Sequence, residues 1–451
     1  MKSVAHLLLT HLDTPSQTVQ EVIASCLPPL ASVIKPDAEQ LIKKLLDKLL
    51  DSTSYSARKG AAYGLAGLVK GLGIPTLKQY QVMQTLKEAI KDKKNYKHRE
   101  GALFAYESLC NMLGRLFEPY VVHLLPDLLL CFGDGNQFVR EATDQTARTI
   151  MARLSSHGVK LILPSLLSAL EEESWRTKAG SAELLGAMAY CAPKQLSSCL
   201  PSIVPRLMDV LADSHSKVQM SGSQALKQIG SVIKNPEIQV LVPVLLEALA
   251  DPSNKAQTCL QALLNTEFVH VIDPPSLALI MPTLKRTLEI RSTDTKKMAA
   301  QIIGNMYTLT DKKDLAPYLP DVLPGLKQSL VDPVPEVRSV CAKALGAMVK
   351  GMGDQGLNEL LPWLLQTLTS ESSSVDRSGA AQGISEVLYA QGVDQLSQLM
   401  PQFVTSCQDI EKPTHMRDGF LMLFVYLPIT FGEQFTKFVA DTLPCILKVI
   451  G

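Results

Sequence analysis

An aliphatic residue or methionine followed by proline recurs about every forty residues, and this period constrains the fold more than any other feature of the sequence. Each pair stands at the start of an apolar run. The pairs are Leu125-Pro126, Leu163-Pro164, Val204-Pro205, Val242-Pro243, Met281-Pro282, Leu323-Pro324, Leu361-Pro362, Met400-Pro401 and Leu443-Pro444. A fixed period of this length is typical of chains that stack one small structural unit on the next. Dividing the 451 residues by this period predicts about eleven units.

Each unit has the pattern of two helices joined by a short turn. In residues 324–330 the apolar residues lie three and four apart, and we expect the proline to form the first helical turn. Asp332 and the two prolines near it predict the turn. Residues 337–349 predict a second helix with small residues where helices approach closely, and Gly351 and Gly353 are typical of its end. No stretch shows sustained strand alternation, so the pattern predicts an all-α protein.

Charged residues recur at fixed places in these turns. An acid often stands eight residues after the proline, and a base often follows about six residues later. We expect the acid to cap the second helix or accept from its N–H groups, and the base to reach the acid of the adjoining unit. The residues of this structural ladder are Asp134, Arg140, Asp213, Asp251, Asp332 and Arg338.

This arrangement of acid, base and small residues resembles that of HEAT repeats. The resemblance implies an α-α superhelix, that is, a solenoid in which each helix pair buries its apolar face against its neighbours. We expect residues 1–451 to form one continuous HEAT-repeat solenoid. Residues 441–451 match the first helix of an incomplete repeat, which favours a chain that is part of a longer protein.

Composition and motifs argue against several classes of function. Lys plus Arg and Asp plus Glu both total 44, which argues against a general polyanion binder. The longest uncharged stretch, residues 419–432, is short for a membrane span and contains a proline. No Gly-Lys dipeptide is present, so the chain has no Walker A loop, and residues 351–356 match Gly-x-Gly-x-x-Gly only after a predicted helix. We therefore expect no catalytic residue, cofactor, metal or small-molecule substrate.

Two basic clusters are the candidate binding sites, and both fall at predicted turns. The first comprises Lys93, Lys94, Tyr96, Lys97 and Arg99, with the tyrosine available to stack on a base. The second comprises Lys285, Arg286, Arg291, Lys296 and Lys297. Solvated turns are the simpler interpretation of both clusters, and contact with the phosphates of a large RNA-containing partner is the other. Five predicted layers separate the two, so only an extended object would engage both.

Several segments go beyond the general HEAT pattern. Residues 99–103, 113–120 and 138–142 are similar to the HEAT domain of fungal translation elongation factor three, and we expect the likeness to be strongest over 80–440. Four further segments closely resemble the general control non-derepressible protein one family of large HEAT-repeat co-activators. They are Ser174-Trp175-Arg176-Thr177-Lys178, residues 187–196, residues 297–307 and residues 375–383.

The resemblance implies a non-catalytic scaffold in the cytoplasm that binds stalled or collided ribosomes. In that family the protein supports the amino-acid-starvation kinase, which phosphorylates the alpha subunit of initiation factor two. The elongation-factor-like region is implied to contact the ribosome, both rRNA and ribosomal proteins, and an ABC-F ATPase partner. The kinase is implied to bind through regions outside this chain. The alternative is a HEAT adaptor for protein partners only, of the transport-receptor or phosphatase-scaffold type.

Overall fold

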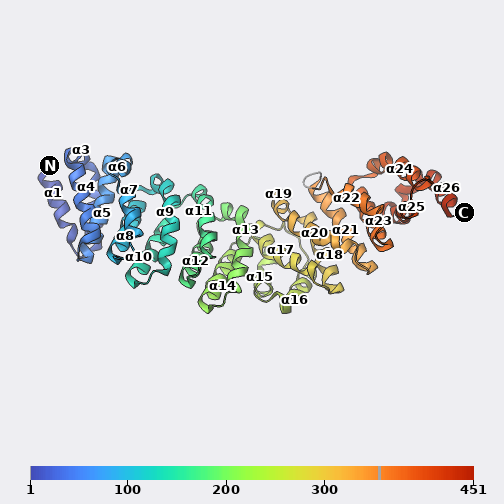
Figure 1. Ribbon diagram of the computed structural model, residues 1–451, viewed down its shortest axis with the longest axis horizontal. Coiled ribbons are helices and arrows are strands. Elements are labelled where there is room, and N and C mark those ends of the chain that lie inside the picture. Colours follow the sequence, from blue (N-terminus) through green and yellow to red (C-terminus); the bar gives the residue numbers. More distant parts are fainter. Residues whose placement is uncertain (1, 354–356, 451) are drawn as a thin grey trace. The chain divides into compact units, whose positions relative to one another are not determined.

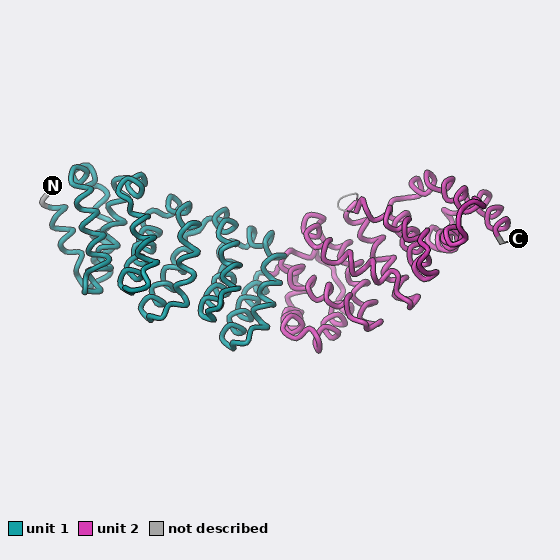
Figure 2. Tube along the Cα trace, viewed as in Figure 1, with its two compact units in different colours: residues 1–232 teal, residues 233–451 magenta. Residues whose placement is uncertain are grey.

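The computed structural model describes residues 2–353 and 357–450, and in this part of the chain helices form all of the regular structure. No strand occurs in the described residues, which confirms the predicted all-α fold. The chain divides into two compact units, residues 1–232 and 233–451, which are coloured separately in Figure 2. The Gly-x-Gly-x-x-Gly match at residues 351–356, which the sequence places after a predicted helix, lies partly outside the described residues. Its Gly353 has a φ of 65° and follows the last residue of a helix, as expected for a helix terminator.

The first unit consists of successive helix pairs, each with a first and a second helix. Its helices are α1 (Lys2–Thr10), α2 (Gln17–Cys26), α3 (Ala31–Ile34), α4 (Ala38–Asp51), α5 (Tyr55–Leu72), α6 (Pro75–Gln79), α7 (Val82–Ile90), α8 (Tyr96–Leu113), α9 (Glu118–Leu130), α10 (Gln137–Arg153), α11 (Ser156–Ala169), α12 (Trp175–Cys191), α13 (Pro193–Leu211) and α14 (Ser216–Ser231). Short 3-10 turns precede or follow several first helices. The regular pairs are α4 with α5, α7 with α8, α9 with α10, α11 with α12 and α13 with α14 (Figure 1).

The second unit repeats the same plan. Its helices are α15 (Pro236–Ala250), α16 (Pro252–Leu264), α17 (Pro274–Glu289), α18 (Thr293–Leu309), α19 (Lys312–Leu315), α20 (Leu319–Leu330), α21 (Pro335–Met352), α22 (Leu360–Leu368), α23 (Ser374–Gln391), α24 (Val393–Gln408), α25 (Thr414–Phe431) and α26 (Val439–Ile450). The pairs are α15 with α16, α17 with α18, α20 with α21, α22 with α23 and α24 with α25.

Within each unit the second helices pack on one another in chain order. Helix α8 lies between α5 and α10, and α12 packs on α14; in the second unit α21 lies between α18 and α23 (Figure 1). The middle of α8 is buried continuously, from Glu100 to Cys110, because it has neighbours on several sides. Each pair thus completes its core only with the pairs beside it, which is the defining property of a solenoid.

Glycines early in the second helices allow the closest approach between layers. The sequence Arg-x-Gly opens α5, α8, α23 and α25. A Cβ added at Gly379 of α23 would lie 2.0 Å from the backbone oxygen of Leu330, which belongs to the first helix of the preceding pair. At Gly419 of α25 the corresponding distance, to the oxygen of Leu368, is also 2.0 Å. Any side chain at these positions would push the layers apart.

The prolines lie further inside the first helices than the sequence predicts. Helix α20 begins at Leu319 rather than at Pro324, and the corresponding prolines of α9, α11, α15 and α24 are also internal. Apolar residues before the proline continue the helical contacts, for example Val322, which is fully buried. The expectation that proline forms the first turn is therefore wrong: burial of the preceding turn outweighs the loss of one helical hydrogen bond.

One described stretch, residues 96–133, is long and apolar enough by length and composition to cross a membrane. It is not a single straight helix. Helix α8 ends at Leu113, Gly114 has a φ of 56°, and α9 begins at Glu118. Because α8 packs between α5 and α10, its apolar composition is that of a core helix.

Candidate nucleic-acid interface

The turns between first and second helices form one edge of each unit, and acids organise them. The side chains of Asp134, Asp213 and Asp332 each accept a hydrogen bond from the backbone N–H two residues later, at 2.8, 2.8 and 3.0 Å. Asp251 instead caps α16 directly and accepts from the Asn254 N–H at 3.4 Å. These bonds fix the turn that precedes each second helix.

Bases early in the second helices reach the acid of the next layer at three junctions. Arg99 of α8 donates two hydrogen bonds to Asp134, at 2.7 and 3.0 Å. Lys178 of α12 contacts Asp213 at 2.8 Å, and Lys296 of α18 contacts Asp332 at 2.9 Å. The bond from Lys178 also holds the pKa of Asp213 below its ordinary value. These three contacts are the ladder pairs.

Arg140 and Arg338 differ from the sequence prediction, because neither contacts an acid of the adjoining layer. Arg140 donates to the Asp134 backbone carbonyl at 2.7 Å, and Arg338 donates to the Asp332 carbonyl at 2.9 Å. Each arginine therefore closes its own turn from six residues away. Turn carbonyls otherwise lack a partner at the end of a first helix, and the guanidinium supplies one.

Three lysines at the first basic cluster have no acidic partner. Lys93 and Lys94 are exposed, Lys97 is half-buried, and none forms an ion pair among the described residues. Arg99, predicted to belong to this surface, is instead engaged by Asp134 in the ladder. The nearby Asp92 side chain accepts a hydrogen bond from the Lys94 backbone N–H and contacts the His98 ring at 2.9 Å. The bond from the Lys94 N–H holds the pKa of Asp92 below its ordinary value. The turn therefore presents three free cationic groups.

The aromatic residue exposed beside these lysines is Phe138, which sequence reasoning missed. Tyr96 is the first residue of α8, and its ring stacks on that of Phe138 in the next layer, with centroids 6.2 Å apart and planes 28° apart. Tyr96 is half-buried, whereas Phe138 is 55% exposed. Asn136 caps α10 by accepting from the Phe138 N–H at 2.9 Å, which fixes the phenylalanine in the second position of the helix. Phe138 stands at the start of a second helix, one repeat after Tyr96, and this position is the signal that could have identified it.

We call Lys93, Lys94, Lys97, Tyr96 and Phe138 the aromatic-basic edge.

The second basic cluster is largely neutralised by neighbouring acids. Lys285 pairs with Asp321 at 2.8 Å and Lys297 with Asp294 at 3.2 Å, while Lys296 belongs to a ladder pair. Arg286 and Arg291 are exposed and form no ion pair in the described part of the chain. This cluster contributes two free cations and no aromatic ring.

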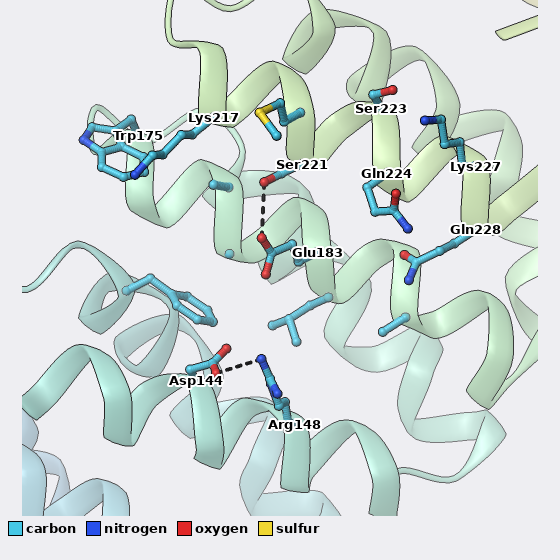
Figure 3. A pocket seen from close by; sticks show the side chains of 16 residues that line it. Asp144, Arg148, Trp175, Glu183, Lys217, Ser221, Ser223, Gln224, Lys227 and Gln228 are labelled. Carbon is cyan, nitrogen blue, oxygen red and sulfur yellow. Dashed lines mark hydrogen bonds and ion pairs between the residues drawn. The ribbon is translucent and has the colours of Figure 1, made fainter.

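A groove of about 820 Å³ crosses α10, α12 and α14. Phe132, Leu184 and Met220 contribute its apolar lining. As Figure 3 shows, Glu183 accepts from Ser221, at 3.3 Å, and Asp144 pairs with Arg148, at 3.0 Å. Its charges are mixed, and the described residues contain no group of three potential metal ligands there or elsewhere.

Buried thiols are not activated as nucleophiles. Burial raises the pKa of Cys110 to about 11 and the pKa values of Cys131, Cys259 and Cys341 to about 12. These thiols are therefore protonated at neutral pH and act as small apolar side chains.

Stacked helix pairs, turns closed by acids and arginines, and a polar edge define a HEAT-repeat protein. The family described as "EF3 N-terminal HEAT repeat" matches residues 58–226, and that described as "Elongation factor 3/GNC1 HEAT repeat" matches residues 255–359. The chain belongs to the GCN1 family of HEAT-repeat proteins, as its similarity over the full 451 residues indicates.

Three curated relatives show the extent of that similarity. "Stalled ribosome sensor GCN1" of Homo sapiens is 67% identical over 451 residues, which are 100% of this chain and 17% of the human protein. "eIF-2-alpha kinase activator GCN1" of Saccharomyces cerevisiae is 43% identical over 98% of this chain and 16% of its own length. "Elongation factor 3" of Gonapodya prolifera is 31% identical over 68% of this chain and 29% of its own length. The chain thus spans about a sixth of the GCN1 proteins it matches.

Proposed function

We propose that this chain is a non-catalytic scaffold segment that binds ribosomes through the aromatic-basic edge. The observation that carries the proposal is the group of three unpaired lysines beside a stacked aromatic pair whose outer ring, Phe138, is exposed. Lysines without acidic partners bind phosphates, and a solvent-facing ring stacks on a base. The relatives named as a stalled ribosome sensor and as elongation factor 3 support a ribosomal rather than another RNA-containing partner.

The names of the relatives support a proposal about the wider role. A GCN1 relative is named an eIF-2-alpha kinase activator, so we propose that the segment holds its protein on stalled or collided ribosomes while the starvation kinase is activated. We propose that the kinase binds regions outside this chain and that an ABC-F ATPase partner contacts the segment. The proposed location is the cytoplasm, where ribosomes are found. The second cluster contributes its free Arg286 and Arg291 as a weaker contact.

Co-sedimentation with purified ribosomes across a salt series tests the proposal. The test variant carries Lys93→Glu, Lys94→Glu and Lys97→Glu, and the control carries Lys43→Glu, Lys44→Glu and Lys78→Glu. The control lysines are exposed and form no ion pair in the described residues. Each variant replaces three lysines with glutamate, so the two have the same net charge.

We expect the test variant to bind more weakly and to lose about 2 to 3 from the slope of log affinity against log salt, because each lost phosphate contact removes a little less than one. We expect the control to retain most of its binding. Equal binding by the test variant and the parent chain at every salt concentration would remove the edge from consideration. If the chain captures the same protein partners from complete and from ribosome-depleted lysates, and no ribosomes from the complete lysate, the adaptor function would be favoured instead.

A further inference from the structure

At the junction between the α20–α21 and α22–α23 pairs, Arg338 of α21 lies against α23, next to Gly379, and forms no ion pair in the described part of the chain. The carboxylate of Asp332 acts on it electrostatically, but that carboxylate contacts Lys296, at 2.9 Å. The Arg338 side chain is 8% exposed, and its Nη1 donates to the carbonyls of Asp332 and Pro333, both at 2.9 Å. Its Nε is buried and has no hydrogen-bond partner. In Arg99, which opens α8 in the same way, Nε donates to the acid of the next layer at 2.7 Å. A buried guanidinium N–H without an acceptor favours an anion placed opposite it.

The residue at the acid's place in the next turn is Ser370. Arg377 of α23 donates to the Ser370 carbonyl at 3.2 Å, just as Arg99 donates to the Asp92 carbonyl at 2.7 Å, and both carbonyls lie seven residues before the arginine. Ser370 therefore stands where Asp92 stands in its own turn. Glu371, which follows, is exposed and forms no ion pair in the described part of the chain.

The turn before α23 is also rich in hydroxyl groups. Ser370 Oγ donates to the Thr367 carbonyl at 2.9 Å and lies 2.7 Å from the Ser372 Oγ. The Nε of Arg377, like that of Arg338, is buried and has no hydrogen-bond partner, and Arg377 is 8% exposed. The serine turn therefore precedes an 18-residue helix that carries Arg377 and packs on Arg338, and the Nε of each arginine lacks an acceptor. The dipole of that helix also favours negative charge at its N-terminus.

We propose that this junction is a receptor for a phosphate carried on Ser370, so that phosphorylation completes the ladder between these two layers. A separate kinase would transfer the terminal phosphoryl group of a nucleoside triphosphate. The bond from that phosphorus to the diphosphate breaks, the bond from Ser370 Oγ to phosphorus forms, and the hydroxyl proton passes to the kinase's base. The phosphate oxygens then accept from Arg338 Nε, as Asp134 accepts from Arg99.

The test places phosphoserine at position 370 of the 451-residue chain by suppression of a stop codon and titrates the phosphate by ³¹P NMR. We expect the second ionisation of the folded phosphate to be at least about tenfold stronger than in the same chain unfolded in urea, because a cation within contact distance stabilises the dianion. Arg338→Met should remove most of this difference, and Arg338→Lys should restore part of it. We also expect slower hydrogen exchange in α21 and α23 of the phosphorylated chain.

Three results would overturn the proposal. The first is an equal ionisation in the folded and unfolded chains. The second is a tenfold difference that survives in both arginine variants, with unchanged circular dichroism showing that they fold. The third is the same hydrogen-exchange protection when inorganic phosphate is added to the unmodified chain, which would indicate a site for a free anion.

Discussion

Gly379→Ala should destabilise the second unit, although alanine is the better helix former. The added methyl group would lie 2.0 Å from the Leu330 oxygen, whereas an ordinary carbon-to-oxygen contact is about 3.3 Å. The two layers must therefore separate locally by about 1.3 Å. Such overpacking costs up to about 3 kcal/mol, and the gain in helix propensity offsets about 1 kcal/mol, so we expect a net loss of about 2 kcal/mol.

Urea unfolding followed by circular dichroism measures this loss. With a slope of about 2 kcal/mol per molar urea, the midpoint of the second unit should fall by about 1 M. Gly304→Ala in α18 is the matched control: the nearest atom to its added methyl group, the Ala344 Cα, is 3.3 Å away, so the neighbour has to move by only a few tenths of an ångström. We expect that variant to stay within about 0.5 kcal/mol of the parent chain. A Gly379→Ala chain at least as stable as its parent would refute the account of layer packing.

Two further predictions separate structural from functional charges. Arg99→Met should destabilise the first unit by about 2 kcal/mol, because it leaves the part-buried Asp134 without its ion-pair partner. Lys97→Met should cost less than about 0.5 kcal/mol of stability and should weaken ribosome co-sedimentation. A larger loss of stability in Lys97→Met than in Arg99→Met would show that the structural and functional roles are wrongly assigned. Because Lys178 lowers the pKa of Asp213, this pair should stabilise the fold above about pH 4 and lose its effect as the pH falls below that value. The difference in urea midpoint between the parent chain and Asp213→Asn should therefore shrink on acidification, and a difference independent of pH would contradict the assignment.

The sequence predicts the helix pairs well because their signals are local and repeated. Period, turn acids and closing glycines all act within one unit, so the second helix predicted at residues 337–349 is found at Pro335–Met352. The start of the first helices is not predicted, because burial of Val322 and its counterparts depends on neighbouring layers that a local pattern does not describe.

The candidate site is predicted only in part, and the reason is again the contact between layers. The charge of Lys93, Lys94 and Lys97 predicts their place in the site without any knowledge of their neighbours. Arg99 looks equally basic in the sequence, yet the acid thirty-five residues later engages it. Tyr96 looks available for stacking, and Phe138 from the next layer covers it and becomes the exposed ring.

The most direct measurement of the central claim is photo-cross-linking from position 138 on purified ribosomes. A benzoylphenylalanine replaces Phe138, and the same group at Leu116, which is 65% exposed in the turn between α8 and α9, serves as the control. We expect cross-links from position 138 to ribosomal RNA that disappear in the triple lysine variant, and few from position 116. Equal cross-linking from the two positions, or none from position 138, would contradict the claim.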